Sequence, residues 1–248
     1  MRYSLREVWS IENKPEPWVI RLIWKPLIVY FVWVNANSVR LKPNEITLLG
    51  GLFGVMSGFG FYWGMPLIGA LLFLLWRIMD YADGMTARLQ ETESCLGAFL
   101  DNYVGGISLF FVSHGLALHL SLTHGTFLWL LFPSVLLFLV LFQSQNSLRV
   151  ANTLPKKAHE HVVDDGDTIK GESALNPILR FLKKNRLAPP LGKEDVIHAM
   201  FIGVPILLLV EQVTSYLLVP LMLLLILNSI FSQYFYITLL REHDAKHQ

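Results

Sequence analysis

Charged residues are scarce in this sequence: Asp, Glu, Lys and Arg make up only 16% of the 248 residues, against about 25% in soluble domains. The charges also nearly cancel, with a formal net charge of +1, which excludes a strongly basic nucleic-acid-binding protein and an acidic disordered chain. The single cysteine, Cys95, excludes an intrachain disulfide framework and a cysteine-rich zinc site. Hydrophobic residues instead make up 53% of the chain, so the composition indicates an integral membrane protein.

Three long windows are free or nearly free of charged residues: residues 46–76, 102–148 and 196–240. Because about 20 apolar residues cross the hydrocarbon core of a membrane, each window can hold two helices, and polar or turn-forming residues break each window. The second helix of the first window is expected to continue past Arg77 into the aqueous interface. The sequence therefore predicts an all-α membrane protein with six transmembrane helices in residues 43–240.

The basic residues predict the orientation of this domain. None of the 20 Lys and Arg residues lies in the loop between the two helices of a window. With six spans, both termini and the long segment 149–195 share one side of the membrane, and the positive-inside rule assigns that side to the cytoplasm. Residues 1–42 are then a cytoplasmic N-terminal segment, and residues 241–248 are a cytoplasmic tail.

The N-terminal segment contains a short amphipathic stretch. Aromatic, aliphatic and basic residues alternate in residues 18–25, which predicts a helix that lies in the membrane interface. A seventh span is the alternative, although it would break the parity of the charges. The predicted architecture is therefore six transmembrane helices preceded by an N-terminal interfacial helix.

Carboxylates occur where the second predicted span meets the cytoplasm. Asp80 and Asp83 lie three residues apart, so a helix places them on one face, and Asp101 near the start of the third span brings a third carboxylate to the same depth. Oxygen ligands from two helices fit a divalent cation such as Mg²⁺, Mn²⁺ or Ca²⁺. The alternative is a structural ion pair, since Arg77 lies three residues before Asp80.

These carboxylates belong to a longer pattern, Asp80-x2-Asp83-Gly84-x2-Ala87-Arg88-x8-Gly97-x3-Asp101. This pattern resembles the signature of the CDP-alcohol phosphotransferases, the CDP-alcohol phosphatidyltransferase family. The segment Lys42-Pro43-Asn44-Glu45-Ile46-Thr47 resembles the family's Pro-Asn entry to its first helix. The resemblance implies transfer of a phosphatidyl group from a CDP-linked lipid, usually CDP-diacylglycerol, to an alcohol, with release of CMP, in phospholipid biosynthesis.

The resemblance also implies roles for individual residues. Three carboxylates would hold Mg²⁺ or Mn²⁺ against the pyrophosphate of the donor: Asp80, Asp83 and Asp101. Gly84 and Ala87 carry little or no side chain, so the nucleotide can approach that helix face closely. Arg88 supplies a planar guanidinium for a phosphate, and Gly97 would allow the second and third spans to pack tightly.

Partners and location follow from this resemblance together with the charge balance and the charge pattern above. We expect a CDP-linked lipid donor, an alcohol acceptor, contact with membrane lipids, a homodimer, and no nucleic acid. The active site would face the cytoplasm from a bacterial inner membrane. A transporter is a weak alternative, because no span carries a charged residue at mid-membrane and no inverted repeat is evident.

The sequence departs from the family at one position. The family signature ends with a fourth Asp, thought to act as general base on the acceptor hydroxyl, and here that position is Gly105. A general base contributes about 10²–10⁴-fold in rate, so no catalytic residue is assigned. Three interpretations stay open: an active enzyme with a base from elsewhere, a variant impaired at this position, and a non-catalytic relative that binds a CDP-lipid or another lipid. Candidate bases in the cytoplasmic segment are His159, His161, Asp164, Asp165 and Asp167.

Overall fold

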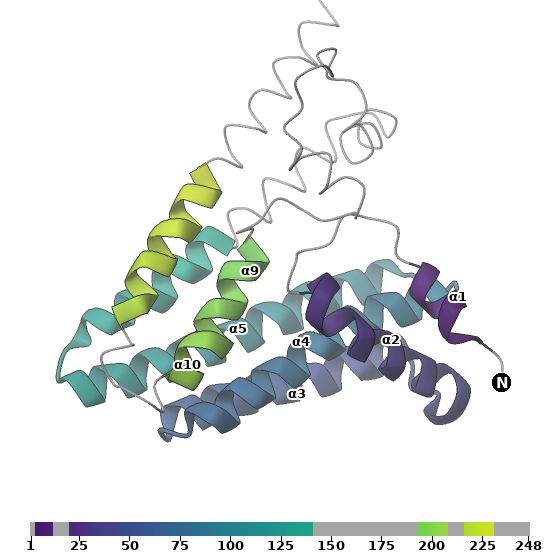
Figure 1. Ribbon diagram of the computed structural model, residues 1–248, viewed down its shortest axis with the longest axis horizontal. Coiled ribbons are helices and arrows are strands. Elements are labelled where there is room, and N and C mark those ends of the chain that lie inside the picture. The colour runs from purple at the N-terminus through teal and green to yellow at the C-terminus, as the bar shows by residue number, and fades with distance from the viewer. Residues whose placement is uncertain (1–2, 12–19, 141–192, 208–215, 231–248) are drawn as a thin grey trace, which may run out of the picture.

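The computed structural model describes residues 3–11, 20–140, 193–207 and 216–230. These residues form helices joined by short turns, and no strand occurs among them, in agreement with the predicted all-α class. Three long helices, α3 (Pro43–Tyr62), α4 (Pro66–Leu89) and α5 (Cys95–His124), lie side by side along the long axis of the molecule (Figure 1). α3 packs along both of its neighbours, whereas α4 and α5 contact each other much less.

Local sequence signals set the ends of these helices. Pro43 and Pro66 each occupy the first turn of a helix. A backbone N–H in the first turn has no partner within the helix, so the N–H that proline lacks is not missed there. Between them the chain turns at Gly64, whose φ of +71° suits a residue without Cβ. α5 begins after Ser94, whose hydroxyl accepts a hydrogen bond from the Gly97 N–H, and it ends at Gly125 in the left-handed conformation.

Glycines allow α3 to approach α5 at backbone distance. A Cβ added to Gly58 would lie 2.3 Å from the Phe111 carbonyl oxygen, and one added to Gly115 would lie 2.0 Å from the Gly58 carbonyl oxygen. One turn earlier, a Cβ on Gly54 would lie 2.4 Å from the Cβ of Ser108. Small residues four apart on α3 therefore form the contact face, as in other closely packed membrane helices.

The N-terminal residues form a separate helical layer against α4. A π-helical turn (Ile20–Trp24), α2 (Lys25–Val34) and a second π-helical turn (Asn35–Val39) follow one another without interruption, and α2 packs on α4. α1 (Leu5–Ser10) is tied to this layer, because the Trp33 Nε1–H donates to the Tyr3 carbonyl at 3.0 Å.

α1 begins with a capping box. The Ser4 N–H donates to the Glu7 carboxylate and the Glu7 N–H donates to the Ser4 hydroxyl. The hydrogen bond from the Ser4 N–H, together with one from the Ser4 side chain, lowers the pKa of Glu7 below its ordinary value. The half of the box that the Glu7 carboxylate supplies is therefore complete when Glu7 is ionised, and it weakens as the pH falls through that lowered pKa.

The remaining described helices cover the other part of α4 and α5. They are an apolar helix (Phe127–Val140) that begins with a 3-10 turn, α9 (Lys193–His198), a π-helical turn (Ala199–Gly203), α10 (Val204–Leu207) and an apolar helix (Leu218–Ile230). Their buried side chains form one hydrophobic cluster with α4 and α5. Beside this cluster, the His198 ring packs edge-on against Phe73, one of its members, and stacks on Trp24 of the N-terminal layer.

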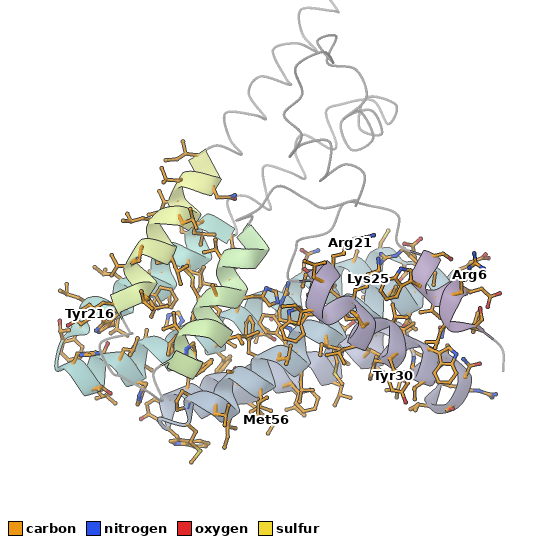
Figure 2. All side chains as sticks on the ribbon, in the orientation of Figure 1. Arg6, Arg21, Lys25, Tyr30, Met56 and Tyr216 are labelled. Atoms are coloured by element: carbon orange, nitrogen blue, oxygen red, sulfur yellow. The ribbon has the colours of Figure 1, made fainter. Side chains whose placement is uncertain are left out.

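Three helices in the described part of the chain are long and apolar enough to cross a membrane: Ile20–Val39, Pro43–Tyr62 and Cys95–His124. Large apolar side chains such as Met56 on α3 point away from the bundle (Figure 2). Both observations indicate an integral membrane protein. α4 extends beyond Arg77 to Leu89, as expected.

Several predictions about the topology concern residues outside the described ranges. The count of six spans also depends on residues 141–192, 208–215 and 231–248, which lie outside the described residues. The helix Ile20–Val39 is long and apolar enough to cross a membrane, so its length fits the alternative of a seventh span. Most of the predicted cytoplasmic segment 149–195 also lies outside the described residues, and its last three residues already belong to α9.

Candidate functional site

A cavity of about 190 Å³ opens where α3 and α5 begin and α4 ends. Its lining comes from all three helices and from the turn between α4 and α5: Pro43, Asn44, Thr47, Asp83, Gly84, Ala87, Arg88, Thr92, Glu93, Ser94, Gly97, Ala98 and Asp101. The three residues predicted to bind substrate, Gly84, Ala87 and Arg88, are therefore in one cavity with two of the three predicted metal ligands. The third, Asp80, is not among the lining residues.

Asp83 is a buried carboxylate of the cavity, and hydrogen bonds hold its side chain in place. Its side chain is only 5% exposed, and Oδ2 accepts a hydrogen bond from the Thr47 hydroxyl at 2.5 Å. Oδ1 lies 2.5 Å from the N–H of Gly84. The hydroxyl of Thr47 also lies 3.1 Å from the Pro43 carbonyl oxygen, one turn earlier on α3. Asp83 is thus attached to the first turn of α3.

Asp80 has a different partner. Arg77 Nη1 lies 2.7 Å from Asp80 Oδ2, and both side chains are largely buried. The ion pair that the spacing of three residues offered as an alternative is therefore present at Asp80. The carboxylate pattern of α4 consequently divides into Asp83, which lines the cavity, and Asp80, which is paired with an arginine.

The three aspartates nevertheless lie within electrostatic reach of one another. Asp83 interacts with both Asp80 and Asp101, and Asp101 interacts with Asp80 and Arg77. Among the described residues, no three His, Cys, Asp or Glu side chains are arranged as a ready metal site. The oxygen donors of Asp83 and Asp101 in one cavity suit a hard divalent cation. A metal held by all three aspartates stays a prediction.

The basic end of the signature faces the same cavity. A Cβ added to Gly84 would lie 3.4 Å from Arg88 Nη1, so the guanidinium of Arg88 folds back over the glycine one turn before it. The missing side chain leaves room for this arginine beside Asp83. Arg88 can therefore bind an anion in the cavity that Asp83 also lines, one to two turns earlier on α4.

Gly97 was expected to permit close packing between the second and third spans, and this interpretation is wrong. A Cβ at Gly97 would meet Ser94 Oγ of its own helix cap at 3.2 Å and Asn44 Oδ1 of α3 at 3.4 Å. No atom of α4 is among these near neighbours. Gly97 instead leaves open the cavity wall formed by α3 and the start of α5.

Gly105 points toward Asp80. An added Cβ would lie 3.9 Å from Asp80 Oδ1, with no other atom of the described residues within 4 Å. Gly106, the next residue, would place a Cβ in open space. Of these two adjacent glycines, only the first therefore directs a substituent at the carboxylates.

Sequence reasoning missed two polar lining residues on α3, Asn44 and Thr47. It treated the segment around Pro43 only as the entry to a helix. Pro43 fixes the first turn of α3, and a helix then brings a residue four positions later to the same side. That spacing is a usable signal for Thr47, but the identity of its partner, Asp83, depends on how α3 packs against α4.

Comparison with known proteins supports the resemblance. The model of the CDP-alcohol phosphatidyltransferase family matches residues 40–163, half of the chain. An archaetidylinositol phosphate synthase of Pyrococcus horikoshii is 27% identical over 81 residues, which are 33% of this chain and 43% of that protein. The corresponding enzyme of Methanothermobacter thermautotrophicus is 29% identical over 85 residues, 34% of this chain and 44% of that protein. A bifunctional IPC transferase and DIPP synthase of Aquifex aeolicus is 32% identical over 81 residues, 33% of this chain and 19% of that protein. These matches span less than half the length of each relative.

Proposed function

Because this chain belongs to the CDP-alcohol phosphatidyltransferase family, we propose that it transfers a phosphate-linked lipid group from a CDP-linked donor to an alcohol and releases CMP. The observation that carries this proposal is the cavity in which Asp83, Asp101 and Arg88 meet between two helix N-termini. The starts of α3 and α5 place the positive ends of two helix dipoles beside it. A site of this kind favours an anionic group such as a pyrophosphate.

The residues of the cavity would have different roles in binding such a donor. Arg88 would bind phosphate oxygens with its planar guanidinium, while Gly84 and Ala87 let the nucleotide lie close to α4. Asp83 and Asp101 would hold Mg²⁺ or Mn²⁺, which when bound neutralises charge on the pyrophosphate and on the leaving CMP. Thr47 keeps Asp83 in place for that purpose.

The reaction itself is a substitution at phosphorus. The oxygen of the acceptor hydroxyl forms a bond to the phosphorus that carries the lipid, and the bond from that phosphorus to the CMP oxygen breaks. The hydroxyl proton passes to a base or to water, and Gly105 supplies no such base. In transfers of this type, positioning and charge neutralisation provide most of the acceleration.

The relatives suggest which acceptor to test first. Two of them are named as archaetidylinositol phosphate synthases, so we propose a phosphorylated polyol such as inositol phosphate as the leading acceptor. The proposed donors are CDP-diacylglycerol and its ether-linked counterpart. We also propose a multi-pass homodimer with both termini and the active site cytoplasmic, in a bacterial inner membrane.

Gly105 favours a second candidate function. A relative without the family's general base could bind a CDP-lipid without turnover, since the cavity residues are retained. The two functions are distinguished by paired measurements on the purified protein: CMP release with each donor and a panel of alcohols, and Mg²⁺-dependent binding of the same donor. CMP release supports the enzyme, whereas binding without release supports the second function and contradicts the first.

Replacing Thr47 with valine is expected to lower turnover about 10- to 100-fold, the usual cost of losing a group that holds a metal ligand in position. Valine keeps the shape of threonine and removes the hydroxyl that donates a hydrogen bond to Asp83. The kcat for CMP release measures this effect. Thr47→Ser restores the hydroxyl and is expected to restore kcat. Equal kcat values for Thr47→Val and the unmodified protein would show that the hydrogen bond has no part in the reaction.

A further inference from the structure

The side chain of Arg77 contacts Asp80, Trp76 and Tyr81. Nη1 lies 2.7 Å from Asp80 Oδ2, and Nη2 donates to the hydroxyl of Tyr81 at 3.2 Å. The guanidinium also lies over the rings of Trp76 and Tyr81, 5.5 and 5.0 Å from their centroids. Its side chain is only 12% exposed. Because an arginine stays protonated throughout the physiological range, these contacts fix a permanent positive charge at Asp80.

The glycine at position 105 lies on the other side of the same carboxylate. Its added Cβ would lie 3.9 Å from Asp80 Oδ1, so a carboxylate at this position would project toward Asp80. The chain therefore lacks a negative side chain where Arg77 already supplies a positive one. Both features act on Asp80. The charge of Arg77 also reaches Asp101, but its ion pair is with Asp80, which does not line the cavity.

The formal charges then match one cation. The three aspartates and the lining residue Glu93 carry four negative charges, and Arg77 and Arg88 carry two positive ones. Two negative charges remain, the charge that a single divalent ion neutralises. With an aspartate at position 105 and no arginine at position 77, the same count would leave four, enough for two such ions. Leaving a buried charge without a partner is costly, so the number of bound ions is expected to follow this balance.

We propose that Arg77 occupies Asp80 in place of a metal ion, so that the site of this chain takes a single divalent cation at Asp83 and Asp101. The proposal rests on the proposed function only in treating the cavity as the metal site. It explains how the chain tolerates glycine at position 105. A fourth carboxylate there would help to bind a second metal ion, and Arg77 already supplies the positive charge of that ion.

The test is the stoichiometry of Mn²⁺ binding, measured on the purified full-length protein in detergent from the electron paramagnetic resonance signal of free Mn²⁺. We expect one tightly bound ion per chain. The double variant Arg77→Gln/Gly105→Asp is expected to bind two, because it removes the guanidinium and adds a carboxylate beside Asp80. Two ions on the unmodified protein, or none, would overturn the proposal, and this result needs no variant to fold.

A matched control separates position from net charge. Arg77→Gln/Gly106→Asp has the same composition as the first double variant but adds its carboxylate one residue away, where a Cβ meets open space. It is expected to bind one ion. If both folded double variants bind the same number of ions, the assignment to Asp80 is wrong. Folding is checked by circular dichroism and size-exclusion chromatography.

Failure of this proposal is distinct from failure of the proposed function. One bound Mn²⁺ without CMP release from any donor would leave the charge assignment standing and overturn the enzyme. Two bound Mn²⁺ ions with CMP release would support the enzyme and overturn the role of Arg77. The two measurements use the same preparation of protein.

Discussion

Replacement of Gly115 by alanine is expected to destabilise the folded protein by more than about 3 kcal/mol, at or beyond the upper end of the usual cost of overpacking. The added Cβ would lie 2.0 Å from the carbonyl oxygen of Gly58 and 2.9 Å from its Cα. These are backbone atoms, so no rotation of a side chain relieves the clash. α3 and α5 would have to separate, and both line the candidate site.

The measurement is the Tm of the protein in detergent, followed by size-exclusion chromatography after heating. Gly106→Ala is the matched control, since it lies on the same helix and its Cβ meets nothing within 4 Å. Alanine is favoured over glycine in a helix by about 1 kcal/mol, so this control is expected to keep or raise the Tm. If the Gly115→Ala protein has the same Tm as the unmodified protein, the backbone contact between α3 and α5 is contradicted.

Asp83→Asn is expected to reduce CMP release by at least about 100-fold. Groups that merely hold a metal ligand in place contribute 10- to 100-fold, so loss of a ligand itself is expected to cost at least the upper value. The substitution keeps the shape of the side chain and removes its charge. Asp83 is buried in the cavity between Thr47 and the N–H of Gly84, and no other carboxylate takes this position among the described residues.

Two readouts distinguish loss of chemistry from loss of folding. Mg²⁺-dependent binding of the CDP-lipid is expected to weaken together with turnover, while the Tm stays close to that of the unmodified protein. Glu7→Gln serves as a control, because Glu7 is an exposed carboxylate on α1, outside the cavity. Undiminished donor binding and turnover in Asp83→Asn would remove Asp83 from the site.

Some features of this protein follow from the sequence alone. The scarcity and placement of charge predicted an all-helical membrane protein, because an uncompensated charge is costly in hydrocarbon. Pro43 begins a helix, as the sequence predicted, and the breaks expected within the first two windows occur at residues 64–66 and at Gly125, since the backbone preferences of these residues act locally. The spacing of the signature predicted the family, which the family comparison confirms.

Only the tertiary structure decided which side chains meet. The helical period places Asp80 and Asp83 on one face and allows an ion pair of Arg77 with Asp80, but it does not choose between that pair and a metal site. Nor does it say that Thr47, 36 residues before Asp83, donates to Asp83. It also does not say that Gly97 faces α3 or that Gly105 faces Asp80. Those partners depend on the rotation and separation of α3, α4 and α5. That geometry is set by close contacts between the glycines of α3 and residues of the neighbouring helices, which are far apart in the sequence. The spacing of four between glycines on α3 indicates a contact face, but it does not say which helix packs against that face.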